Sequence, residues 1–518
     1  MDWIQLQTTL PQYSGASART QRLMNLSTVL DCTMYDRISN PFSMERNGAG
    51  EYIPLDRRRP SVRTHLIRTV IEDLVALLFG EAHFPSVKAE NPDTQEALSS
   101  FIRCAGIEPV MQHACLRGQL GSVALLVELQ QFRPVVTVLD TAFLTPEWDE
   151  LTGELIRVRE RYRITGEQVR ALGHAVADED LKADFWWLRE WDASDCTIYV
   201  PQLVSSESHP AIDPNATTSH AFGFVPVVWI KNDGTRATTA DPDGCCLFER
   251  AIDNQIEADY VLSQAGRGLK YAADPVLVIK DDPIGTLTSP DGVPVEGQDQ
   301  PARRAGGAAS ALEIGTNGDA KLLEINGTSA SALIAYEKAI RNVILEQMHG
   351  SRADPDKMSA AQSGRAMEMM CAGLTWLAGR MREPFGQCGL LVLLRMVCRL
   401  STIVDDGVEI DGERAKAIDP AGLGLVWPQW FQPTPMEFLQ TAQGLATARD
   451  GNLMSDETAC GLWCAFIGVD NSAEEWARVQ AELADAAAQT AKQAGIVAAG
   501  DTRKAATSGN TLSHKVQA

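Results

Sequence analysis

Apolar residues recur at helical spacing in the run that follows Pro60. The recurring positions are Leu66, Ile67, Val70, Ile71, Leu74, Leu77 and Leu78. This spacing predicts a helix with one buried face, and Gly80 is placed where such a helix ends. Weaker patterns predict helices over residues 18–35, 93–105 and 108–118.

Shorter apolar runs follow, separated by glycine, proline and aspartate, and they predict strands. These runs cover residues 121–129, 134–140, 155–164, 185–192, 196–201 and 222–232. In the runs 155–164 and 185–191, arginine or glutamate alternates with apolar residues, as in a half-exposed strand. The first 245 residues are therefore predicted to have an α+β fold.

The middle of the chain has a different pattern. It predicts a helix over 247–266, ended by Gly266 and Gly268, then an insert over 271–326, and then a helix over 329–348. A polar loop, 349–359, precedes a third helix over 360–385. Two helices that bracket an insert favour a stalk carrying a module at its tip over a compact catalytic core.

The insert is dense in glycine, proline, aspartate and alanine. Residues 275–280 and 321–325 are short strand candidates within it, and residues 282–307 between them are predicted to be a mobile loop or disordered hairpin. Toward the C-terminus, helices are predicted over 436–448, 455–467 and 473–494, and the segment 498–518 has the composition of a disordered tail.

The first middle helix carries two stripes. Its apolar stripe comprises Phe248, Ile252, Ile256 and Tyr260. Its acidic stripe, with carboxylates four residues apart, comprises Glu249, Asp253 and Glu257. Stacked like charges weaken a helix slightly, so this stripe is either a solvated face or a wall that must stay negative. The second middle helix has one apolar stripe, made of Leu333, Tyr336, Ile340 and Ile344.

Composition narrows the function classes. The 518 residues, 45% of them hydrophobic, can form two to four domains with real cores. The formal net charge of −22 argues against tight nucleic-acid binding, which needs lysine and arginine against phosphates. An acidic surface would instead let a polyanion pass without sticking. Alternatively, the acidity serves only solubility.

Cysteines and apolar segments give no sign of export or of a membrane. The 11 cysteines are scattered without a CxxC pair, which favours a reducing compartment over a zinc or disulfide framework. The N-terminus lacks the basic start and apolar core of a signal peptide. The apolar stretch 388–397 is interrupted by Arg395 and is too short to span a bilayer.

Catalytic motifs are also missing. The sequence contains no GxxxxGK[ST], HExxH or GxSxG, and no GxGxxG after a predicted strand. Acidic pairs such as Asp241 with Asp243, or Asp405 with Asp406, stand in turn sequences, and the histidines are isolated. These observations predict a protein that is not an enzyme and has no cofactor or metal.

Three blocks carry a family resemblance. The first is residues 52–80, with an arginine-rich entry to the helix and a glycine stop. The second is the order helix, insert, helix, loop, helix, in which the third helix begins with Ser363, Gly364 and Ala366. The third is VWPQWFQPTP, a helix, GNLMSDET and a glutamate-rich helix. In this order the blocks resemble those of tailed-bacteriophage portal proteins.

The resemblance implies an α+β portal fold with named parts. Residues 1–245 would form the mixed α/β wing, 246–270 the first stem helix, 271–326 a small α/β clip and 327–348 the second stem helix. A tunnel loop (349–360), a long wing helix with strands (361–432), crown helices (433–497) and the tail (498–518) would follow.

The resemblance also implies a function. Portal proteins form a ring, usually of twelve subunits, at a unique capsid vertex, and the ring is assembled in the host cytoplasm. The ring is the channel for packaging and ejecting double-stranded DNA. It docks the large terminase and later the head–tail adaptor, and it contacts the major capsid protein, with scaffold as a further candidate partner.

Site residues follow from the same resemblance. Channel-lining carboxylates would be Glu249, Asp253 and Glu257, although charge alone does not separate a channel face from an outer face. The tunnel loop would place Arg352, Asp354, Asp356 and Lys357 at the channel. The clip docking surface would include Asp281, Asp282, Arg303 and Arg304.

Two other interpretations stay open. A minor capsid protein or head–tail adaptor would have no paired stem helices and would form no closed ring. A hydrolase or nuclease fused to a helical domain would need carboxylates or histidines that converge in space, and the sequence indicates none.

Overall fold

A computed structural model describes residues 1–206, 209–273, 276–280, 319–323, 327–350, 371–430, 435–469 and 472–509. The chain forms two compact units, Met1–Val426 and Trp427–Ala518. The fold is mixed α+β, as the sequence predicted.

The N-terminal helices of the first unit match the predicted pattern. They are α2 (Ala18–Leu30), α3 (Leu66–Phe79), α4 (Pro92–Cys104) and α5 (Ile107–Gly118), whereas α1 (Trp3–Gln7) and a short 3-10 turn before α3, η1 (Leu55–Arg57), were not predicted. Helix α3 buries the apolar face expected for it, and Gly80 is its C-cap. Asn91 is the N-cap of helix α4, and its side chain accepts the N–H of Asp93.

Two antiparallel sheets contain most of the strands of the first unit. The three-stranded sheet has the order β10 (Val227–Lys231), β2 (Ser122–Gln130), β3 (Arg133–Leu139). The six-stranded sheet has the order β4 (Leu144–Trp148), β5 (Leu155–Thr165), β6 (Asp184–Trp191), β7 (Asp195–Ile198), β9 (Thr218–Ser219), with β8 (Gln202–Leu203) paired to β6. Short turns of helix, η2 (Thr141–Phe143), α6 (Gly166–Ala171) and η3 (Asp178–Asp180), lie between these strands in sequence. The buried side chains of Leu126, Val158 and Trp191 belong to one core shared by both sheets.

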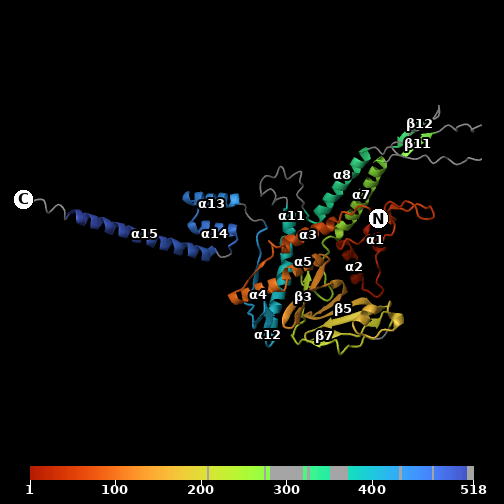
Figure 1. The fold of residues 1–518 in the computed structure, drawn as a ribbon, viewed down its shortest axis with the longest axis horizontal. Coiled ribbons are helices and arrows are strands. Elements are labelled where there is room, and N and C mark those ends of the chain that lie inside the picture. The colour runs from red at the N-terminus through yellow and green to blue at the C-terminus, as the bar shows by residue number, and fades with distance from the viewer. Residues whose placement is uncertain are drawn as a thin grey trace, which may run out of the picture. The chain divides into compact units, whose positions relative to one another are not determined.

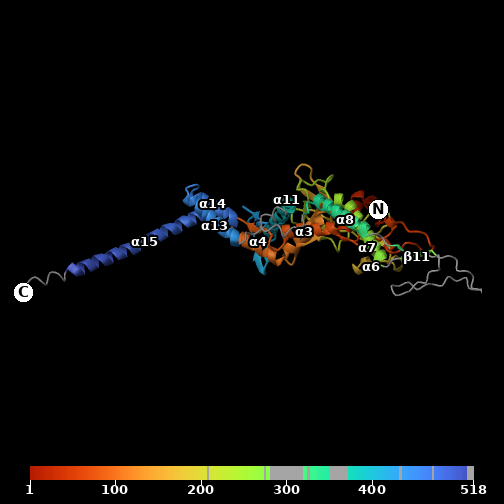
Figure 2. The same cartoon turned by 90° about the horizontal axis from the view of Figure 1, so that it is seen from above.

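The predicted middle helices are present as a pair. A 3-10 turn, η4 (Glu249–Ala251), leads into α7 (Ile252–Ala273), and α8 (Gly327–Gln347) packs beside α7 (Figure 1 and Figure 2). The two strand candidates of the insert pair antiparallel as β11 (Val276–Lys280) and β12 (Asp319–Leu323).

The predicted stop of the first middle helix is wrong. Helix α7 continues through Gly266 and Gly268 to Ala273. A glycine inside a helix costs only about 1 kcal/mol relative to alanine, and packing against α8 offsets a cost of that size.

A long apolar helix crosses the first unit. Helix α11 (Ala372–Met381), the π-helical segment η5 (Arg382–Leu390) and helix α12 (Leu391–Ile403) follow one another without a break. Pro384 lies in η5, and the wider π turn accommodates a residue that lacks an N–H and crowds the preceding turn. By length and composition this helix is apolar enough to cross a membrane, but 61% of its most apolar window is buried inside the protein, as in a core helix.

Short strands complete the first unit. Strand β13 (Val408–Ile410) pairs with β14 (Glu413–Ala415). Strand β15 (Gly424–Val426) pairs with β1 (Ser86–Lys88), which returns the chain to its N-terminal part.

The second unit consists of α13 (Pro435–Asp450), α14 (Asp456–Ile467) and α15 (Ser472–Gly509). Its aromatic contacts join Phe438 to Trp463 and Phe466. Among residues 435–469 and 472–490 of this unit, whose burial is described, Cys464 is the fully buried residue. The tail was predicted from residue 498, whereas α15 continues to Gly509; residues 510–518 lie outside the described residues.

Candidate functional site on the paired helices

Helix α7 carries three buried polar residues at four-residue spacing. Gln255, Asp259 and Ser263 are at most 1% exposed and lie on the side of the helix that packs into the first unit. Because residues four apart share one face of a helix, the three side chains form a ladder. We call Gln255, Asp259 and Ser263 the polar ladder.

The polar ladder accepts backbone N–H groups from the segment that enters α3. Gln255 Oε1 accepts from Ile67 N at 2.9 Å, and Asp259 Oδ1 accepts from Thr64 N at 2.8 Å. Ser263 Oγ accepts from the backbone N–H groups of Ser61 and Val62, each at 3.0 Å. The first N–H groups of a helix have no partner within the helix, so the ladder pairs a donor that α3 cannot pair itself.

Asp259 is the charged member of the ladder. Its Oδ1 also accepts from the Thr64 hydroxyl at 2.9 Å, and its Oδ2 accepts from the Tyr35 hydroxyl at 3.0 Å. Burial raises the pKa of Asp259 to about 6, against the opposing effects of the Thr64 and Tyr35 hydrogen bonds and the charge of Arg63. The pKa of Tyr35 is raised as well, by burial and by the adjacent carboxylate.

Removing one acceptor from the ladder should destabilise the first unit. Gln255→Met keeps the length of the side chain but leaves the buried N–H of Ile67 unpaired, and we expect the free energy of unfolding to fall by about 2 kcal/mol. Urea denaturation followed by circular dichroism measures this. Gln264→Met, at a half-exposed position of the same helix, is the matched control; equal losses for the two variants would contradict the role of the ladder.

The predicted acidic stripe runs from η4 onto another side of α7, partly against the N-terminal segment. Glu249 pairs with Arg22 of α2 at 2.7 Å, and Asp253 Oδ1 accepts from the backbone N–H of Trp3 at 2.6 Å. Asp253 and Glu257 are exposed. The structure therefore brings two of the three carboxylates to N-terminal residues, a contact that the sequence did not predict.

Helix α8 is much less covered than α7. Ile340 and Ile344 of the predicted apolar stripe are buried, and so is Met348, which was not part of the prediction. Leu333 is half-buried and Tyr336 is 50% exposed, so the N-terminal part of the stripe is not in the core.

An apolar flank of α8 is exposed beside its buried face. It consists of Ala332, Tyr336, Ala339 and Val343, at spacings of four, three and four residues. Tyr336 is 50% exposed and Val343 is 42% exposed. Apolar positions at this spacing form a continuous seam of the kind that packs against another helix. We call these four residues the α8 seam.

The other predicted site residues cannot be placed. The tunnel-loop residues Arg352, Asp354, Asp356 and Lys357 and the clip residues Asp281, Asp282, Arg303 and Arg304 lie outside the described residues. The described segment before the loop ends at Gly350. The residue before it, His349, has a φ of +54°, and its ring centre lies 5.1 Å from that of Trp376.

The described residues hold no group of three or more histidine, cysteine or acidic side chains that could bind a metal. The described histidines with a perturbed pKa are His65, His113 and His220, and in each case burial lowers the pKa.

Sequence reasoning missed the polar ladder. The signal was present, because Gln255, Asp259 and Ser263 repeat every four residues next to the apolar stripe of Ile256 and Tyr260. The more conspicuous acidic stripe is not buried: Asp253 and Glu257 are exposed and Glu249 is half-exposed.

A comparison with protein families gives one match over most of the chain. The sequence model described as "Phage portal protein, SPP1 Gp6-like" matches residues 53–489. No curated protein matches the chain. The matched range contains α7, α8, the polar ladder, the α8 seam and most of the second unit.

The chain is therefore a component of a phage capsid, and the family whose model it matches is a structural one. It belongs to the phage portal protein family, whose members assemble into an oligomeric ring.

Proposed function

We propose that twelve copies of this chain form the ring at a unique capsid vertex, and that the ring is the channel through which DNA is packaged and ejected. The observation that carries this proposal is the α7–α8 pair, in which α7 is anchored to the rest of the first unit, together with the antiparallel β11–β12 strand pair of the insert between the two helices (Figure 1). In this proposal α7 and α8 are the stem, and the insert 271–326 is the clip.

The α8 seam is proposed to be a contact between neighbouring subunits. Subunits in a closed ring contact each other through two different patches, one on each side. Tyr336 and Val343 are seven residues apart and share one flank of α8, whereas Ile334, 43% exposed, lies on the opposite flank. Apolar side chains on both flanks of one helix fit a position between two neighbours.

The acidic stripe of α7 is proposed to face the channel. Glu257 is its exposed member that has no N-terminal partner among the described residues, so it carries the most accessible charge. A negative wall repels the phosphates of the duplex, which lowers DNA affinity and favours sliding.

Charge reversal tests this assignment. Assembled Glu257→Lys rings should retain linear double-stranded DNA about tenfold more strongly than wild-type rings at low salt, because lysines at the wall release phosphate counterions. A filter-binding titration at several salt concentrations measures the retention. Glu257→Gln removes the charge without reversing it and should show a much smaller gain. Equal retention by wild-type and Glu257→Lys rings would mean that this face does not reach the DNA.

The clip and the loop after α8 are proposed to make the remaining functional contacts. The clip would dock the large terminase during packaging and the head–tail adaptor afterwards, with Asp281, Asp282, Arg303 and Arg304 on its surface. Residues 349–360 would form the tunnel loop, in which Arg352, Asp354, Asp356 and Lys357 mix both signs of charge. The second unit would form the crown, whose small core implies contacts with other copies.

Electron microscopy and mass photometry of the purified full chain test the proposal as a whole. A closed ring with a central hole and a mass of about 676 kDa, twelve times 56.3 kDa, is the expected result. A particle that remains a 56.3 kDa monomer under all assembly conditions would contradict it and would favour a minor capsid or adaptor role.

A further inference from the structure

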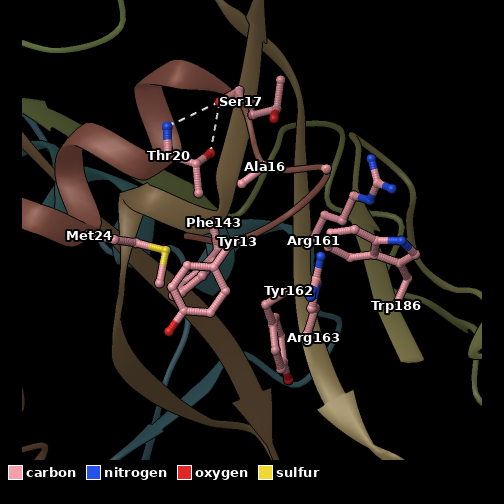
Figure 3. Close-up of a pocket in the computed structure, with 12 residues that line it drawn as sticks. Tyr13, Ala16, Ser17, Thr20, Met24, Phe143, Arg161, Tyr162, Arg163 and Trp186 are labelled. Carbon is pink, nitrogen blue, oxygen red and sulfur yellow. Dashed lines mark hydrogen bonds between the residues drawn. The ribbon is translucent and has the colours of Figure 1, made fainter. Parts of the chain in front are cut away.

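A cavity of about 510 Å³ lies on the six-stranded sheet (Figure 3). None of its lining residues belongs to α7 or α8. Strand β5 contributes Arg161 and Arg163, and strand β6 contributes Trp186, which pairs with Arg163 across the sheet. The segment before and within α2 provides further walls through Tyr13 and Met24. Figure 3 shows the arginines and Trp186 on one side of the cavity and the Tyr13 and Met24 side chains on the other.

The cationic wall is held in place by stacking. The Arg161 guanidinium carbon lies 3.9 Å from the centre of the Trp186 ring, and that of Arg163 lies 5.1 Å from it. Stacking uses the face of a guanidinium and leaves its edge N–H groups free to donate. Two guanidinium groups thus converge on one aromatic ring in a chain whose formal net charge is −22.

The two arginines differ in their partners. Arg163 pairs with Asp184 at 3.3 Å and donates to the carbonyl oxygen of Ser14. Arg161 has no carboxylate within ion-pairing distance among the residues that the structure describes. Burial and the charge of Arg163 lower the pKa of Arg161, so a bound anion would relieve an electrostatic cost that is already present.

The other walls suit a flat, partly apolar group. The rings of Phe143 and Tyr162 are half-buried, with centres 6.0 Å apart, and Tyr13 is 37% exposed. Hydroxyl groups of Ser17 and Thr20, 2.8 Å apart, add polar contacts at the edge. A basic wall next to partly exposed aromatic rings is the arrangement that binds single nucleotides of an unpaired strand.

We propose that this cavity binds one nucleotide unit, with its phosphate on the edge of Arg161 and its base against the rings of Tyr13 and Phe143. Guanidinium edges bind phosphate oxygens in pairs, and an aromatic ring contributes base stacking of any sequence. The unit is either a free mononucleotide or an unpaired nucleotide of a DNA strand. The site does not depend on the proposed roles of α7 and α8.

The test uses the full-length chain and three probes: dAMP, inorganic phosphate, and a short single-stranded DNA oligonucleotide. Isothermal titration calorimetry should detect dAMP binding that is stronger than phosphate binding, because only dAMP brings a base. Arg161→Gln should weaken dAMP binding at least about tenfold through the loss of a charged hydrogen-bond donor. Arg170→Gln, at an exposed arginine of α6 outside the cavity, is the matched control and should bind dAMP as the wild type does.

Each outcome decides the proposal. Arg161 is exposed, so the Arg161→Gln chain should unfold at the wild-type temperature, which a thermal melt checks. Tighter binding of the oligonucleotide than of dAMP identifies a DNA strand as the source, and equal binding identifies the free nucleotide. No dAMP binding, binding unaffected by Arg161→Gln, or phosphate binding as strong as dAMP binding would each overturn the nucleotide site.

Discussion

The full-length chain with Tyr336→Glu and Val343→Glu is expected to remain a 56.3 kDa monomer under conditions in which the wild type forms rings of about 676 kDa. Both side chains belong to the α8 seam and are 50% and 42% exposed in the single chain. In the ring they would be buried against a neighbour, where an unpaired carboxylate is strongly disfavoured. Two such charges at each of the subunit contacts should abolish assembly.

Mass photometry across a range of protein concentrations measures the effect. Leu151→Glu is the matched control, because Leu151 is an apolar residue that is 94% exposed at the turn between β4 and β5 and lies outside the seam. The control should form rings as the wild type does. The double variant should keep the wild-type circular dichroism spectrum, since both positions tolerate water in the single chain. Rings of normal mass and yield from the double variant would rule out the seam as a subunit contact.

Asp259→Asn is expected to gain stability relative to the wild type as the pH rises from about 4 to about 7. The pKa of Asp259 is about 6 in the folded chain against 3.8 for an ordinary aspartate. The folded state therefore holds its proton over a range in which the unfolded state has lost it, and the stability linked to that proton disappears as the pH passes 6. The difference between the two pKa values corresponds to about 3 kcal/mol.

Asparagine preserves the geometry because its oxygen accepts from Thr64 and its amide group faces the Tyr35 hydroxyl, which can accept. Urea denaturation at several pH values, in the non-assembling Tyr336→Glu/Val343→Glu background, isolates the difference from assembly. Asp406→Asn, at an exposed loop position, is the control and should follow the wild type. A constant difference between Asp259→Asn and the wild type across this pH range would contradict the raised pKa.

Much of the fold could be predicted because periodic patterns dominate it. The apolar face of α3, the alternation along β5 and the two strands of the insert were readable from spacing alone. The continuation of α7 past Gly266 was not, since tertiary packing against α8 decides it. Short strands such as β4 and β15 were also missed, because their partners are fixed by the folded arrangement and not by local sequence.

The site residues were likewise predictable from local pattern, but their contacts were not. Glu249 and Asp253 were singled out for their charge, but their contacts with Arg22 and Trp3 join residues more than two hundred positions apart. Such pairings leave no trace in local sequence. The cavity at Arg161 was missed for the same reason, because Trp186 meets the arginine only through the pairing of β5 with β6, and Tyr13 arrives from a distant segment.

The polar ladder has a consequence for how the family can vary. Most of its hydrogen bonds go to backbone N–H groups of residues 61–67, so they constrain those positions only by the presence of an N–H. Ser61 and Val62 can mutate to almost any residue without detaching α7, whereas proline, which has no N–H, is forbidden there. The side chains of the segment that donates these N–H groups can therefore vary in evolution while Gln255, Asp259 and Ser263 stay fixed. Sequence constraint from the anchoring of α7 would then be seen on α7 and not on its partner segment.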